Sequence, residues 1–153
     1  QGRPELRTAR REDGKGMNID WPIKGEEWED MVAAGRGWEI LIPDWLPSSM
    51  NSLIRNSWTA YMGERRFIQR YLSDNYRHVP PAMGKRGIKI AIIKTSGQWD
   101  DEPNLDGRSK ATLDAMTKLA MLRDDSRRWL EWNHVQEVHG TIKGVAIRLW
   151  EVD

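Results

Sequence analysis

Acidic side chains gather around one helix-like segment in the second half of the chain. Asp106 precedes this segment, and Asp124 and Asp125 follow it. Carboxylate oxygens are the ligands that Mg²⁺ prefers in proteins. Lys110 stands four residues after Asp106, where its positive charge can stabilise a phosphate group. These residue types at this spacing are compatible with a magnesium site that acts on a phosphate ester.

A purely structural role for the same acids stays open. Apolar residues at steps of three and four predict an α-helix over residues 110 to 122. Asp106 would then be an N-cap, because a short carboxylate accepts hydrogen bonds from the unpaired amides of a first helical turn. Asp124 and Asp125 are typical of the turn that ends such a helix. Capping and solvation alone therefore account for all three acids.

The length and composition indicate one domain without covalent cross-links. A chain of 153 residues is about the size of one domain with its own core. The absence of cysteine excludes disulfides and thiolate zinc sites and is compatible with the cytoplasm. We find neither an apolar run of about eighteen residues nor a secretory leader, so we expect no membrane span. The sequence also lacks a P-loop and the H-E-x-x-H pair of zinc hydrolases.

Basic charge is concentrated before the acidic segment. Residues 50 to 90 contain eight lysines and arginines against Glu64 and Asp74. A basic surface beside an acidic cluster suits a protein that binds a polyanion and holds a divalent cation against it. An ordinary solvated surface is the alternative. If the partner is DNA, Trp58 can stack on an unpaired base, whereas most of the nine tryptophans are expected to be buried. The candidate phosphate contacts are then Arg55, Arg65, Arg66 and Arg70.

The remaining pattern predicts a single α+β domain, with a mixed β-sheet and two main helices packed on it. Residues 1 to 36 form an extension with a loose arm and a short helix over residues 26 to 34. Residues 37 to 153 form the domain, in the order β-α-β-α-β-β, and the last two strands are expected to pair antiparallel. Besides the helix over 110 to 122, the predicted elements are a helix over 64 to 76 and strands over 38 to 42, 88 to 94, 129 to 138 and 145 to 152.

Four short motifs follow the second predicted strand in a fixed order. They are Asn104-Leu105-Asp106-Gly107, Lys110, Leu113-Asp114-Ala115-Met116 and Asp124-Asp125. This order resembles the RusA family of Holliday junction resolvases, whose pattern is D-L-D-N, a lysine four residues after the second aspartate, a helix often containing L-D-A-L, and a paired D-D. The resemblance covers residues 38 to 152. It implies a RusA-like fold and a Mg²⁺-dependent homodimeric endonuclease that cuts four-way DNA junctions in recombination and repair, in the cytoplasm and of bacterial or phage origin.

The resemblance also implies roles for individual residues. Asp106 and Asp125 are expected as direct Mg²⁺ ligands. Asp124 is expected either as an additional ligand or as a residue that supports the ligands without touching the ion. Asn104 is expected as a weak ligand. Lys110 is expected to stabilise the negative charge that develops on the phosphate during hydrolysis.

Two positions depart from the family pattern. Asn104 stands where the family has its first aspartate, and Gly107 stands where it has asparagine. An amide oxygen can bind Mg²⁺ but brings no charge, so metal affinity should fall. The chain would then be a slow nuclease, or a junction-binding protein of the same fold that does not cut. Alternatively, a nearby carboxylate supplies the missing charge, and the candidates are Asp100, Asp101 and Glu102.

Distance predicts how the acids could meet. About a dozen helical residues at ~1.5 Å each separate Asp106 from Asp125 by roughly 18 Å, too far to share one ion unless the chain folds back. In a dimer whose two helices run antiparallel, the Asp106 end of one helix lies beside the Asp125 end of the other. We therefore expect composite sites at a two-fold interface. A small interaction module, whose acids only cap and solvate, is the interpretation from another functional class.

Overall fold

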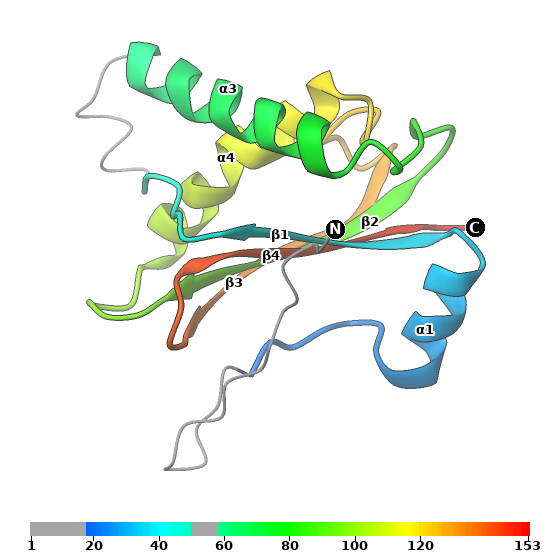
Figure 1. The fold of residues 1–153 in the computed structure, drawn as a ribbon, viewed down its shortest axis with the longest axis horizontal. Helices are drawn as coiled ribbons and strands as arrows, with labels where there is room; N and C mark the ends of the chain where they lie inside the picture. The colour runs from blue at the N-terminus through cyan, green and yellow to red at the C-terminus, as the bar shows by residue number, and fades with distance from the viewer. Residues whose placement is uncertain (1–17, 50–57) are drawn as a thin grey trace.

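The structure is a four-stranded sheet with two helices on one face and a shorter helix on the other (Figure 1). It is a computed structural model that describes residues 18–49 and 58–153. In chain order the described elements are α1 (Gly25–Ala33), β1 (Gly37–Pro43), α3 (Trp58–Asn75), β2 (Arg86–Lys94), α4 (Glu102–Lys118), β3 (Leu130–His139) and β4 (Gly144–Glu151). α3 and α4 lie together on one face, whereas α1 lies against the opposite face (Figure 1).

The sheet has the order β1-β4-β2-β3 and is mixed. β4 pairs antiparallel with both β1 and β2, whereas β2 and β3 are parallel and are joined through α4. An α+β fold with a mixed sheet is therefore confirmed. The expected antiparallel pairing of the last two strands is wrong, because β1 and β2 occupy both sides of β4 and β3 pairs with β2.

β2 lies inside the sheet because it is apolar on both faces. Every residue of this strand is buried. Ile88, Ile90 and Ile92 belong to the core under α3 and α4, and Ala91 and Ile93 belong to a second cluster on the opposite face. A strand of this kind is favoured where both faces of the sheet are covered. The more polar β3, with the sequence LEWNHVQEVH, takes the edge position.

α4 begins about two turns earlier than the apolar pattern predicts. Its N-cap is Asp101, whose carboxylate accepts a hydrogen bond from the amide of Asn104 at 3.0 Å. The prediction that Asp106 caps this helix is therefore wrong, because Asp106 lies inside α4. The helix also ends before residue 122, since Ala120 adopts a positive φ of 61°.

Candidate functional site

Three charged side chains follow one side of α4. Asp106, Lys110 and Asp114 are spaced by four residues, so they project from the same side of the helix. The Nζ atom of Lys110 lies 3.8 Å from the Asp114 carboxylate and 5.5 Å from the centroid of the Tyr61 ring on α3. The Lys110 side chain is 53% exposed. This stripe is therefore open to a ligand or to a second chain.

Asp125 approaches the same stripe from the loop after α4. Burial raises the pKa of Asp114, and the negative charge of Asp125 raises that pKa further, whereas Lys118 acts in the opposite direction. Two carboxylates that repel each other form a place where a divalent cation is stabilised. Asp114 and Asp125 are therefore near enough for their charges to interact, and Lys110 is paired with Asp114.

Asp114 is the residue of this group for which the sequence pattern predicted no functional role. It belongs to the Leu113-Asp114-Ala115-Met116 motif, but an acid four residues after Lys110 has the spacing of an ordinary helical ion pair. Only the approach of Asp125, which is close in space and not in sequence, distinguishes Asp114 from such a pair.

The other predicted ligands do not join this pair within one chain. Asp106 is exposed and stands eight residues before Asp114, about 12 Å along the helix. The Asp124 carboxylate accepts a hydrogen bond from the amide of Asp125 at 2.6 Å, as in a turn. Among residues 18–49 and 58–153, no three acidic or histidine side chains are grouped so that they could hold a metal ion.

Asn104 lies in the first turn of α4, two positions before Asp106. On an α-helix this separation turns the two side chains about 200° apart. A metal ion shared by Asn104 and Asp106 would require the first turn of α4 to open. The carboxylate of Asp101 is occupied as the N-cap, and Glu102 is exposed.

Asp100 is held in a network of buried charges at the start of α4. Its carboxylate lies 3.2 Å from Lys94 Nζ and accepts a hydrogen bond from Arg108 Nε. Glu137 of β3 lies 3.4 Å from the same lysine and accepts a hydrogen bond from the Asp100 amide at 2.8 Å. Arg108 also donates to the carbonyl of Pro47. This network fixes α4 against the carboxyl ends of β2 and β3, so Asp100 already has its counter-charges.

Removing one charge from this network should destabilise the fold. We expect Asp100→Asn to lower the free energy of unfolding at pH 7 by about 3 kcal/mol, because Lys94 and Arg108 lose a buried partner. Urea unfolding measures the change. Asp30→Asn on the exposed side of α1 is the matched control and should change it by less than about 0.5 kcal/mol.

The same network predicts how stability depends on pH. Burial raises the pKa of Asp100, but the hydrogen bonds and charges of Arg108 and Lys94 outweigh burial and leave this pKa below its ordinary value. The stabilisation is therefore present above the unfolded-state pKa of about 4 and is lost as the pH falls through the folded-state value. The difference between wild type and Asp100→Asn should shrink below about pH 4. An equally large difference at pH 2 would contradict this role.

Basic side chains of α3 and two exposed tryptophans form the second part of the candidate site. Arg65, Arg66 and Arg70 line a groove beside the end of α4. Trp58 is 70% exposed, and its stacking on a base stays a prediction. Trp99, which the sequence did not single out, is 65% exposed and stacks on the ring of His139 with centroids 4.0 Å apart. Arg55 lies outside the described residues.

Comparison with protein-family models and with curated proteins finds no match for this chain. In the described part of the chain, each helix is too short or too polar to cross a membrane.

Proposed function

We propose that this chain is a Mg²⁺-dependent endodeoxyribonuclease that resolves four-way DNA junctions, as its resemblance to the RusA family implies. The observation that carries the proposal is the row of charged side chains on α4, in which Lys110 lies 3.8 Å from the Asp114 carboxylate and the charge of Asp125 acts on Asp114 from the next loop. This arrangement supplies two hard oxygen ligands and one cation, which are the groups that metal-assisted phosphodiester hydrolysis needs. Bacterial or phage DNA in the cytoplasm would be the substrate.

The site is completed by a second copy of the chain. Within the described part of one protomer no third acid joins Asp114 and Asp125 in a metal-binding group, and Asp106 lies about 12 Å from Asp114 along α4. In a two-fold dimer with antiparallel α4 helices, Asp106 of one chain would lie beside Asp114 and Asp125 of the other. Each of the two sites would then hold three acids, and two symmetric sites suit two symmetric cuts in a junction.

The residues of the stripe divide the chemistry between them. A bound Mg²⁺ would lower the pKa of a water molecule and offset the charge on the phosphate. Asp106, Asp114 and Asp125 would hold this ion through their carboxylate oxygens. Lys110, which is exposed and four residues after Asp106, would donate to the phosphate oxygens as negative charge develops.

Contacts to the DNA backbone would come from α3. Positive charge on this helix comes from Arg65, Arg66 and Arg70. Their contacts to phosphates would not depend on the base sequence, which suits a protein that recognises the branched shape of the DNA. Arg55 belongs to the same proposal from its sequence position. Trp58, at the start of α3, is available to stack on a base exposed at the branch point.

A labelled four-way junction incubated with protein and Mg²⁺ tests the proposal. We expect wild type to cleave, and Asn104→Asp to change the rate by less than about threefold, because Asn104 projects away from the stripe. Cleavage by neither protein would contradict the nuclease assignment.

A junction-binding protein that does not cut is the second candidate. It is favoured by Asn104, which brings no charge at a position where the resembling family has an aspartate. The same assay separates the two candidates. Cleavage that appears only in Asn104→Asp, by tenfold or more over wild type, would show a lost ligand and support the binding-only protein.

A further inference from the structure

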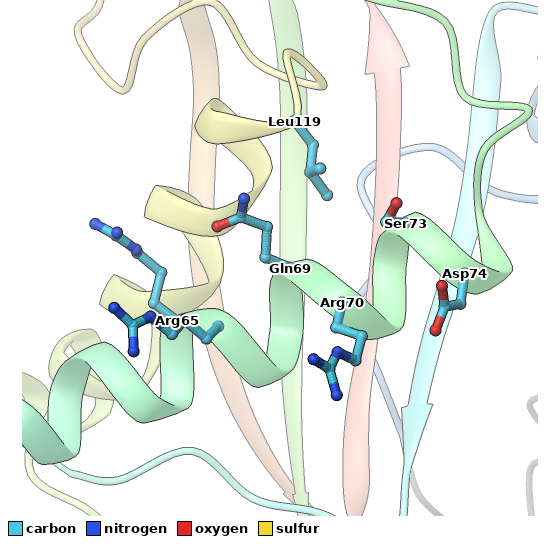
Figure 2. A pocket seen from close by; sticks show the side chains of 7 residues that line it. Arg65, Gln69, Arg70, Ser73, Asp74 and Leu119 are labelled. Carbon is cyan, nitrogen blue, oxygen red and sulfur yellow. The ribbon is translucent and has the colours of Figure 1, made fainter.

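A groove of about 500 Å³ runs along α3 beside the end of α4. Figure 2 shows that five of its side chains, Arg65, Gln69, Arg70, Ser73 and Asp74, come from α3, with Leu119 following α4. Arg66 completes the lining. The groove thus combines three guanidinium groups with an amide, a hydroxyl and a single carboxylate, and it is strongly cationic.

Among the described residues, the three arginines of this groove form no ion pair. The Nε atom of Arg65 is buried and has no hydrogen-bond partner in the described structure. Burying a donor without an acceptor is unfavourable, so an acceptor from outside the described structure is expected at this group. Arg66 and Arg70 are exposed, and neither forms an ion pair with any of the described residues.

We propose that this groove is a subsite for consecutive phosphates of one nucleic acid strand. A phosphate group presents several acceptor oxygens, and arginine donates to it through two parallel hydrogen bonds. Two neutral donors add to the arginines. Gln69 lies between Arg65 and Arg70 along α3, and Ser73 lies after Arg70. The subsite rests on the proposed function for the identity of its polyanion, a strand of the DNA junction.

The length of the groove fits more than one phosphate. Residues 65 to 73 span about 12 Å of helix, whereas phosphates follow one another every ~3.4 Å of axis along one strand. Asp74 stands at the far end of this series in the chain, and its carboxylate repels phosphate. The arginine end is therefore the one that binds most strongly.

Salt dependence of junction binding tests the subsite. Dissociation constants for a fluorescent four-way junction would be measured without divalent metal between 50 and 200 mM KCl. We expect Arg65→Gln and Arg70→Gln each to reduce the slope of log affinity against log salt by about 1 and to weaken binding about fivefold. Asp74→Asn should tighten binding about twofold. Arg70 is exposed, so Arg70→Gln keeps the test valid if Arg65→Gln is unstable.

Lys143→Gln is the matched control, because it removes one positive charge from the exposed β3–β4 turn. We expect it to leave the slope unchanged. Equal slopes for wild type, Arg65→Gln and Arg70→Gln would overturn the subsite, as would equal losses in Lys143→Gln.

Inorganic pyrophosphate distinguishes a strand from free phosphate. One outcome would overturn the proposal. In it, millimolar pyrophosphate binds to wild type but not to Arg65→Gln, while the dissociation constant for the junction is the same in wild type and in the groove variants. The groove would then bind free phosphate. The nuclease assignment and the subsite can be refuted independently. Wild-type cleavage with unchanged slopes refutes only the subsite, whereas reduced slopes in a protein that never cuts support the subsite and refute only the nuclease.

Discussion

Asp114→Asn should lower the single-turnover rate of junction cleavage about 100-fold in Mg²⁺ while junction binding stays within about twofold of wild type. The substitution preserves the shape of the side chain and removes its charge. In the structure Asp114 is partly buried, and the charge of Asp125 acts on it. Its ion pair with Lys110, at 3.8 Å, is open to solvent. A helical ion pair of this kind contributes only about 0.3–0.5 kcal/mol to stability. A large loss of rate without loss of fold would therefore report a ligand role.

A Mg²⁺ titration separates a metal-ligand role from a structural role. If Asp114 holds the ion, the cleavage rate of Asp114→Asn should recover in part at high Mg²⁺, because weaker binding is overcome by concentration. Asp30→Asn, on α1 at the opposite face of the sheet, is the matched control and should cleave like wild type. Wild-type cleavage by Asp114→Asn would remove this residue from the site.

Ile92→Ala should lower the free energy of unfolding by about 2–5 kcal/mol. Ile92 in β2 is 0% exposed and packs in the core under α3 and α4. The truncation removes buried methyl groups and leaves a cavity that the surrounding strands can only partly fill. Chemical denaturation followed by tryptophan fluorescence measures the change.

Ile142→Ala is the control with the same chemistry. Ile142 is 65% exposed in the turn before β4, so its truncation should change stability by less than about 0.5 kcal/mol. If the two variants are equally stable, β2 is not at the centre of the core.

The elements that the sequence predicts well are those with a strong local pattern. The apolar run of β2 predicts a buried strand, and the structure places this strand inside the sheet. The pairing of β3 could not be predicted in the same way. The short turn before β4 favours a β3–β4 hairpin locally, but strand pairing depends on the whole sheet. Because β1 and β2 pair with the two sides of β4, no side of β4 is left for β3.

The start of α4 is indicated by its capping residues but not by the apolar pattern. Asp101 followed by Pro103 is typical of a helix N-terminus, since a carboxylate caps the first amides and proline needs no donor in the first turn. Gly107 weakens the helical pattern between these residues and Lys110. The prediction therefore placed the start of the helix too late and gave Asp106 the capping role of Asp101.

The candidate site was only partly predictable because its contacts are tertiary. Lys110 and Asp125 were named from the motif order. In the structure Lys110 pairs with Asp114, and the charge of Asp125 raises the pKa of Asp114. Asp100 pairs with Lys94 of β2 and Arg108 of α4, so it already has counter-charges. The spacing of these residues in the sequence does not predict that they meet.

Complementation between two inactive variants tests the composite site most directly. Asp106→Asn and Asp125→Asn would each be purified alone and also co-expressed, and cleavage of the labelled junction would be measured in Mg²⁺. In a composite dimer, each heterodimer keeps one site with both native acids, so random pairing should restore about a quarter of the wild-type sites. A co-expressed mixture that is no more active than either variant alone would contradict sites shared between two chains.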